Sequence, residues 1–409
     1  MNRIAAVFLV IVQSFFLFAC NGNGANTARE DNINLSDSSD ESRTELKVAF
    51  QGPNPTATEL YINKFNETNT EYYAVFIDYG MDEDGLETLM RDISYGNAPD
   101  VVVSSGIMDT ANGFADLYEF MDEDTEISRE DFIPGLLPKL EDKGELHQIW
   151  DQFHIDTMFV PEEPFAEIDF MTLQEVAEQY RQLNSDGDLF SSWTDKMTFV
   201  NSVCVGMISR CVDFEQGSAN FATEEFNYIY EMCNALPEEV DAERITFEEG
   251  IIKTYSIMAP ETMEGITEAY GTNIRFFASA DRAENYTGMW CRTGGRIMIP
   301  SRSENQAGAW EFIKTVLSYE CQISNKEFFR SGLPVIAEAF HEVTSEMDNE
   351  EKKMLDKLMD SAVVINSNYL EIAHLINSYF EELFVAQKTE EQAASSLSNK
   401  VSLLLAERK

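Results

Sequence analysis

Short apolar runs alternate with segments of helical spacing in the first part of the chain. Apolar, β-branched and aromatic residues predict strands over 46–50, 72–78 and 101–103. A helix is expected over 56–67, where a threonine can cap its start. Apolar residues at i, i+3, i+4 and i+7 predict another helix, carrying the stripe Leu86, Leu89, Met90 and Ile93. This alternation of strands and helices is typical of an α/β lobe with a parallel sheet.

The remainder of the chain has a less regular pattern. Helical spacing predicts helices over 172–183, 223–236 and 306–317, and nearly continuous helix from Asn349 to the end. Apolar, β-branched composition predicts strands, which we place at 200–208, 275–278 and 296–300. The roughly 365 residues from Leu46 onward exceed what one hydrophobic core holds, so two lobes are expected.

The N-terminus has the pattern of an export signal. An apolar run over 4–18 follows the basic start, and Leu17-Phe18-Ala19 precedes Cys20. This arrangement resembles the bacterial lipoprotein signal, which implies that residues 1–19 are removed and Cys20 is lipidated. An ordinary signal peptide with a chance cysteine, or an uncleaved anchor helix, stays an alternative. Residues 20–45 are polar and predict a disordered tether.

Charge and cysteine content narrow the possible partners. A formal net charge of −44 argues against nucleic acid and against anionic lipid, so membrane contact is expected through the lipid alone. The cysteines after Cys20 are odd in number and irregularly spaced, which indicates small buried hydrophobes rather than a disulfide framework. A bond between Cys204 and Cys211 stays open.

Motifs for catalysis or metal binding do not stand out. The sequence has no Gly-x-Ser-x-Gly, no His-Glu-x-x-His and no phosphate-binding Gly-rich loop. Asp186-Gly187-Asp188 lacks the remainder of a calcium loop. We therefore expect no enzyme, no metal and no cofactor, although a polysaccharide-cleaving lipoprotein remains an alternative.

Several segments together resemble extracellular solute-binding proteins of family 1, the substrate receptors of ABC importers. The matching segments are Asn97–Val102, Ala115–Phe120, Phe132–Leu136, Gly144–Ile149, Arg296–Ile313 and Ser331–Val335. The resemblance implies a two-lobed α/β fold of the periplasmic-binding-protein-like class II, with a hinge and a cleft between the lobes. It implies a first lobe of about 46–150 completed by 293–332, and a second of about 155–290 completed by 335–409.

The resemblance also implies a function. A lipid-anchored monomer on the extracellular face of the cell membrane would capture a small solute, a sugar or an oligosaccharide, and deliver it to an ABC permease. The segment after Ile149 lacks the proline usual in the family. A surface lipoprotein of the same fold that acts as a sensor or adhesion protein therefore stays an alternative.

Candidate ligand-binding residues follow from two arguments. Ligands of open α/β sheets lie beyond the carboxyl ends of the strands, and the polar residues expected there are Gln51, Asn54, Asp78, Tyr79, Ser104 and Ser105. Sugar sites use aromatic plates, and the plates expected near the lobe crossovers are Trp150, Phe153, Tyr286 and Trp290. Turn formation is the alternative role for the polar set, and core packing for the aromatic set.

Overall fold

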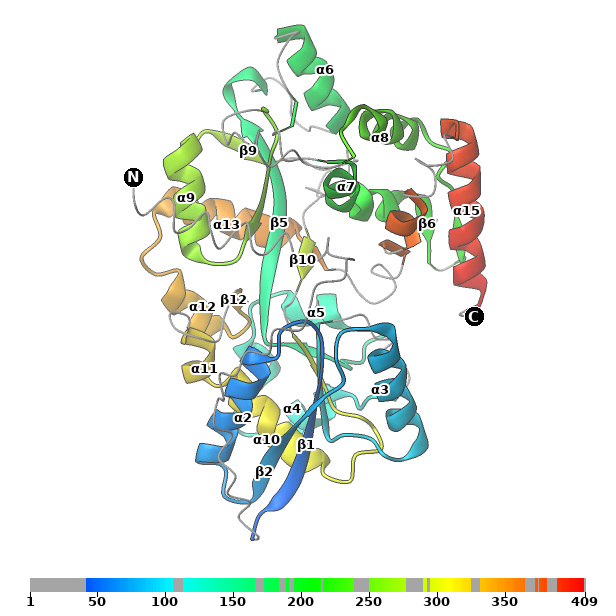
Figure 1. Cartoon of the computed structure of the whole chain (residues 1–409). Helices are drawn as coiled ribbons and strands as arrows, with labels where there is room; N and C mark the ends of the chain where they lie inside the picture. The colour runs from blue at the N-terminus through cyan, green and yellow to red at the C-terminus, as the bar shows by residue number, and fades with distance from the viewer. Residues whose placement is uncertain are drawn as a thin grey trace, which may run out of the picture.

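Two β-sheets, each covered by helices, form the two lobes of the molecule (Figure 1). The computed structural model describes residues 42–105, 113–165, 173–183, 189–190, 195–214, 216–238, 250–276, 290–292, 295–324, 332–364, 372–373, 375–380 and 388–407. The predicted signal, Cys20 and nearly all of the tether lie outside the described residues.

The first sheet has the strand order β2-β1-β3-β11-β4. Its strands are β1 (Thr44–Gln51), β2 (Tyr72–Asp78), β3 (Val101–Ser104), β4 (Ile149–Trp150) and β11 (Arg296–Met298). Strand β1 pairs in parallel with β2 and β3, whereas β11 runs antiparallel to β3 and β4. The predicted parallel α/β lobe is therefore confirmed, and the carboxyl ends of β1, β2 and β3 meet at one edge.

Helices pack on both faces of this sheet (Figure 1). Helix α3 (Glu83–Tyr95) places Leu89 and Ile93 of the predicted stripe against Val102 of β3. The opposite face packs against α2 (Thr56–Thr68) and α10 (Gln306–Leu317). Shorter helices complete the lobe: α4 (Leu117–Glu123), η2 (Arg129–Asp131), α5 (Leu136–Leu140) and α11 (Tyr319–Ile323).

The second sheet has the order β12-β5-β10-β13, and β8 and β9 also pair with β5. Its strands are β5 (Gln152–Pro161), β8 (Lys253–Ile257), β9 (Ile274–Phe276), β10 (Trp290–Arg292), β12 (Leu333–Pro334) and β13 (Val363–Val364). The long strand β5 runs from the first lobe into the second (Figure 1), so Asp151 marks the passage between the sheets.

The elements around the second sheet are mainly helical. They are η3 (Glu163–Phe165), α6 (Leu173–Leu183), α7 (Lys196–Cys211), the hairpin β6 (Val212–Asp213) and β7 (Ser218–Ala219), α8 (Glu224–Ala235), α9 (Pro260–Tyr270), α12 (Ala337–Val343), α13 (Asn349–Ser361) and α15 (Glu390–Glu407). A separate apolar cluster joins α6, α7, α8 and α15. This second core agrees with the expectation that one core does not hold the whole chain.

One prediction about an element is wrong. Residues 200–208 belong to helix α7 and not to a strand. Its buried residues Val200, Val203 and Met207 are spaced by three and four, which is helical spacing, whereas the prediction followed β-branched composition. The described part of the C-terminal region is nearly all helix, as predicted, with the two-residue strand β13 as the exception, which pairs in parallel with β10.

Asp100 ties together two of the segments that carry the family resemblance. Its carboxylate accepts hydrogen bonds from the backbone N–H of Lys47 (2.8 Å), from Ser303 Oγ (2.7 Å) and from Asn305 Nδ2 (3.3 Å). Asp100 is buried. The Pro-Asp turn before β3 is thereby fixed to the loop before α10.

Asp116 makes a comparable connection between two further segments of the resemblance. Its Oδ1 accepts hydrogen bonds from the N–H groups of Tyr118 (3.0 Å) and Leu146 (2.9 Å). The first bond caps helix α4, and the second holds the segment that leads into β4. Both aspartates therefore stabilise the first lobe.

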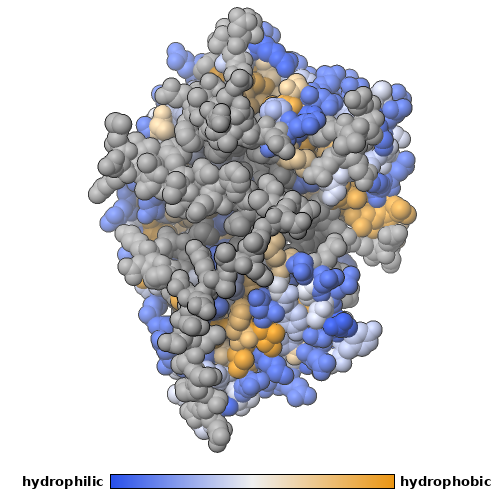
Figure 2. Space-filling model, viewed as in Figure 1, coloured by the Kyte–Doolittle hydropathy of each residue, from blue (hydrophilic) through white to orange (hydrophobic). Residues whose placement is uncertain are grey.

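The described surface is mostly hydrophilic, and the space-filling view shows this on one face (Figure 2). This agrees with the 73 acidic residues of the chain. The exposed large apolar side chains are Met81, Tyr95, Tyr319 and Leu403. None of the described helices combines the length and the apolar character that a membrane crossing needs.

Candidate ligand-binding site

A row of polar and aromatic residues crosses the first sheet at the edge where β1 and β3 end. Gln51 of β1 is the register partner of Ser104 in β3, which faces Arg296 of β11, which in turn faces Trp150 of β4. Directly paired residues project from the same face of a sheet. We call Gln51, Ser104, Arg296 and Trp150 the edge row.

Hydrogen bonds and close contacts fix the edge row. Ser104 Oγ donates to Gln51 Oε1 at 2.9 Å, and Arg296 Nη1 donates to the carbonyl of Ser105 at 3.2 Å. Gly52 lies so close that an added Cβ would stand 2.3 Å from Ser105 Oγ. A residue without a side chain at position 52 therefore lets the ends of β1 and β3 approach each other.

Arg296 is the charged member of the edge row and has only 5% of its surface exposed. Burial lowers the pKa of its guanidinium to about 10, and the nearby carboxylate of Asp151 opposes this shift. The side chain remains a cation at neutral pH, with Asp151 as its counter-charge. The interior of this edge thus carries a balanced pair of charges.

Sequence reasoning missed Arg296 as a site residue. The available signal was a basic residue at the start of an apolar strand, Arg296-Ile297-Met298-Ile299, in a chain with only 29 Lys and Arg. Lys and Arg are almost never fully buried unless they are paired.

The remaining polar candidates lie nearby but differ in their roles. Asn54 and Asp78 are exposed and accept hydrogen bonds from the N–H groups of Thr56 (3.1 Å) and Gly80 (2.8 Å). These contacts match the alternative of turn formation. Tyr79 is half-buried and donates to Asp92 at 2.9 Å. Burial, and then this hydrogen bond, raise the pKa of its phenol to about 12.

The aromatic candidates lie deeper than a solvent-facing plate would. Trp150 has none of its surface exposed and Phe153 has 1%. Phe153 stacks on Phe340 of α12 with ring centroids 6.3 Å apart. Both side chains thus lie in the core, which is the alternative given for the aromatic set. Tyr286 and the side chain of Trp290 lie outside the described residues, although the backbone of Trp290 begins β10.

Buried polar atoms without hydrogen-bond partners gather along the strand that leaves the first sheet. Within the described part of the chain they include Trp150 Nε1 and the side-chain oxygens of Gln148 and Gln152. An unsatisfied buried polar atom typically costs about 1–3 kcal/mol. The indole of Trp150 therefore presents an unused donor next to Arg296 in the edge row.

The chemistry of the edge row is that of hydrogen bonding. It offers an amide, a hydroxyl, a guanidinium and an indole N–H. In the described ranges, no group of three or more His, Cys, Asp or Glu residues is arranged to hold a metal ion. Cys211, Cys233 and Cys321 are buried, as expected for small hydrophobes.

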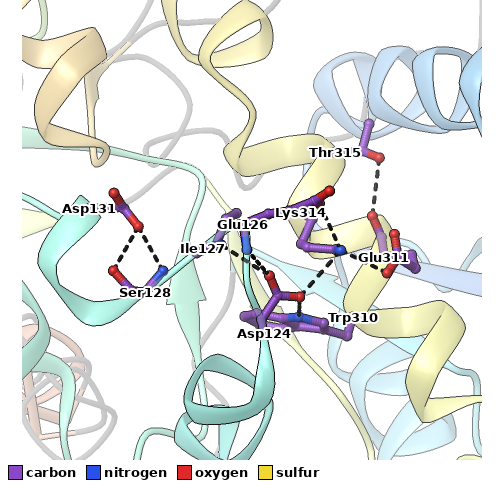
Figure 3. Close-up of polar contacts among 9 residues, drawn as sticks. All are labelled: Asp124, Glu126, Ile127, Ser128, Asp131, Trp310, Glu311, Lys314 and Thr315. Carbon is purple, nitrogen blue, oxygen red and sulfur yellow. Dashed lines mark hydrogen bonds and ion pairs between the residues drawn. The ribbon is translucent and has the colours of Figure 1, made fainter.

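A second polar cluster joins the end of α4 to α10 (Figure 3). The Asp124 carboxylate accepts hydrogen bonds from Trp310 Nε1 at 2.8 Å and from the N–H groups of Glu126 and Ile127, and Lys314 Nζ lies 3.3 Å away. Lys314 also contacts Glu126 and Glu311. Burial opposes ionisation of Asp124, but these hydrogen bonds outweigh it and lower its pKa to about 2. This cluster holds helices together and lies apart from the edge row in the chain.

Comparisons with known proteins agree on the fold. No family model matches the sequence, and no curated protein matches it. Among solved structures, the sugar-binding protein MalE of Xanthomonas citri matches with a TM-score of 0.63 at 13% identity, over 89% of this chain and 98% of that chain.

Two further solved structures match with similar TM-scores and sequence identities. The acarbose-binding GacH receptor of Streptomyces glaucescens matches with a TM-score of 0.58 at 16% identity, over 89% of this chain and 99% of that chain. An extracellular solute-binding protein of family 1 from Alicyclobacillus acidocaldarius matches with a TM-score of 0.57 at 13% identity, over 89% of this chain and 98% of that chain. The two-lobed fold of ABC-importer solute-binding proteins, which the sequence resemblance implied, is thus confirmed.

Proposed function

We propose that the protein captures a small solute between its two lobes and delivers it to an ABC permease. The observation that carries this proposal is the fold likeness to sugar-binding receptors over almost nine-tenths of the chain. Solved relatives of this shape were determined with cycloalternan, α-D-tagatose or maltose. The proposed solute of this chain is therefore a sugar or an oligosaccharide, and the protein acts as a binding protein and not as an enzyme.

The edge row supports a neutral, hydroxyl-rich solute. Arg296 already has Asp151 as its counter-charge, so the row has no surplus cation to attract an anion. Sugar hydroxyls accept from and donate to amides and hydroxyls, which Gln51 and Ser104 supply in this row. We place the ligand beside Gln51 and Ser105, where the edge row meets the ends of β1 and β3.

We also propose how the protein is attached to the membrane and where its two lobes meet. A lipid on Cys20 would hold a monomer at the extracellular face of the cell membrane, and the tether to about residue 45 would let it reach the permease. We propose lobes that meet near 150–155, 290–296 and 331–336. Mass spectrometry of protein from its native membrane tests the lipid, and Cys20→Ala should release the protein into the medium.

Thermal unfolding tests solute capture directly. The panel contains maltose, maltotriose, cycloalternan, xylo-oligosaccharides and tagatose, with amino acids and short peptides as the comparison set. A sugar at a hundred times its Kd stabilises the folded protein by about 2.7 kcal/mol, which raises the melting temperature. Calorimetry then gives the Kd for wild type, Gln51→Ala and the control Gln306→Ala, whose amide at the start of α10 donates to the carbonyl of Ser301.

The outcomes separate the alternatives. A sugar that binds, with weakened binding in Gln51→Ala alone, supports the proposal and the placement of the site. Binding of peptides alone would remove the sugar class. An absence of binding across the whole panel would contradict solute capture and favour the sensor or adhesion role.

A further inference from the structure

The segments that connect the two sheets meet at one buried point. Asp151 lies between β4 of the first sheet and β5 of the second, and Gly295 lies between β10 of the second and β11 of the first. The segment 333–336 touches both lobes, because β12 pairs with β5 and Ile336 forms a bridge with Phe132. Any change in the angle between the lobes must therefore act through these segments.

Asp151 and Gly295 clasp each other by reciprocal hydrogen bonds. The backbone N–H of Asp151 donates to the carbonyl of Gly295 at 3.2 Å, and the N–H of Gly295 donates to Asp151 Oδ1 at 3.0 Å. Asp151 is only 3% exposed. A Cβ on Gly295 would stand 3.0 Å from Asp151 Oδ2, so this position has no room for a larger residue without a shift of the carboxylate.

The side chain of Gln322, from helix α11, links this clasp to the remaining segment. Its Nε2 donates to the carbonyl of Asp151 at 2.9 Å and to the carbonyl of Val316 at 3.0 Å. Its Oε1 accepts from the N–H of Val335 at 3.0 Å. The amide is 1% exposed, so water does not readily replace these bonds.

Val335 also contacts the first lobe. Its carbonyl accepts a hydrogen bond from the N–H of Ile133 at 3.0 Å. The connected set therefore joins the first lobe, all of these connecting segments and helix α11. We call Asp151, Gly295, Gln322 and Val335 the crossover hub.

The hub adjoins the edge row through charge. The charge of Asp151 raises the pKa of Arg296 against the effect of burial, while the backbone of Asp151 makes the bonds to Gly295 and Gln322. A contact that moves Arg296 would therefore act on the residue that joins the connecting segments. Ligand closure in two-lobed proteins proceeds by changes at a few connecting residues.

We propose that Asp151 and Gln322 are positioning residues that fix the resting angle between the lobes and thereby set how readily the protein closes on its solute. The effect on solute affinity rests on the proposed function, whereas the effect on the resting angle rests on the crossover hub alone. Hydrogen bonds that hold the resting state favour it over other lobe angles, so their removal shifts the population.

The experiment measures the distance between the lobes in the ligand-free full chain. Spin labels carried by a ketone-bearing unnatural amino acid replace Glu87 on α3 and Asn399 on α15, which are exposed and lie on different lobes (Figure 1). The native cysteines stay untouched. Pulsed electron resonance then gives the distribution of distances for each variant, and the melting temperature is recorded in parallel.

Gln322→Met removes the hub amide, and Gln306→Met is the matched control. The control loses one hydrogen bond, from Gln306 Nε2 to the carbonyl of Ser301 at 3.0 Å, inside the first lobe. We expect a narrow distribution for wild type and control. For Gln322→Met we expect a second lobe distance whose share rises about tenfold, because its hydrogen bonds to the connecting residues Asp151 and Val335 are lost.

Gly295→Ala supplies an independent perturbation of the same hub. Its added methyl presses on Asp151 without removing the Gln322 amide, and we expect it to broaden the same distribution. Two folded hub variants with the wild-type distribution would overturn the proposal, even if their melting temperatures fall, because a purely structural role predicts that result. Failure of both to fold would overturn it as well. None of these outcomes depends on a solute, so they are separate from the test of solute capture.

Discussion

Replacement of Asp100 by alanine removes the acceptor that joins β1, β3 and the loop before α10. The backbone N–H of Lys47 and the side chains of Ser303 and Asn305 lose their bonds at 2.8, 2.7 and 3.3 Å. Asp100 is 5% exposed, so the variant leaves these donors at a largely buried place.

The cost follows from the bond types. Hydrogen bonds to a charged acceptor contribute about 1.5–3 kcal/mol each, and the long bond from Asn305 less. Ser303 and Asn305 are partly exposed, so water satisfies them in part. We therefore expect Asp100→Ala to lower the free energy of unfolding of the first lobe by about 3–5 kcal/mol. Asp100→Asn keeps one oxygen acceptor and should cost about 1–2 kcal/mol.

Urea unfolding followed by tryptophan fluorescence measures this loss. Two of the four tryptophans, Trp150 of β4 and Trp310 of α10, belong to the first lobe, so part of the signal reports on the region that Asp100 stabilises. The control is Asp356→Ala, an exposed position of α13, where a change within about 0.5 kcal/mol is expected. A loss below about 1 kcal/mol for Asp100→Ala would refute the argument that this aspartate ties the lobe together.

Further predictions test packing, charge and the aromatic candidates. Gly308→Ala should lower the free energy of unfolding by about 1 kcal/mol or more, because the added Cβ would stand 2.6 Å from the ring of Tyr72 and this overpacking outweighs the gain in helix propensity. Gly265→Ala on α9 is the control. Its Cβ would have no atom within 4 Å, so this variant should raise the free energy of unfolding in the same urea assay. Asp124 has a pKa lowered to about 2, so its stabilising contribution is present above the ordinary value of 3.8 and is lost as the pH falls toward 2. The difference in free energy of unfolding between wild type and Asp124→Asn should therefore shrink between pH 5 and pH 2, and a constant difference would contradict the assignment. Trp150→Phe should lower the free energy of unfolding by about 1–3 kcal/mol, while the Kd for the solute changes less than about twofold. A larger loss of affinity, measured by calorimetry, would indicate that Trp150 contacts the ligand.

The fold was largely predictable because its signals are local. The strands β1, β2 and β3 are short apolar runs, and α3 carries a regular stripe at Leu86, Leu89 and Ile93. Helix α7 was missed because Val200 and Val203 favour strands in composition, while their spacing favours a helix. The spacing of apolar residues determines which element forms, because the residues of a buried face must recur with the period of that helix or strand.

The candidate site was less predictable because it depends on register. Gln51 and Ser104 follow from the rule about strand ends, but Arg296 joins them only because β11 runs antiparallel beside β3. A shift of one residue would turn Arg296 to the other face of the sheet. No local pattern fixes such a register, so the sequence marks Arg296 as a basic residue at the start of an apolar strand but does not place it beside Ser104.

The same reasoning explains why the family resemblance predicts the fold better than the solute. Asp100 and Asp116 belong to two of the matching segments, and their side chains accept hydrogen bonds within the first lobe. Such residues can persist while the solute changes, because they hold the scaffold. The determinants of the solute should therefore lie beside Gln51 and Ser105, where the ligand is proposed to bind, and substitutions there should alter affinity more than substitutions at Asp100 in protein that still folds.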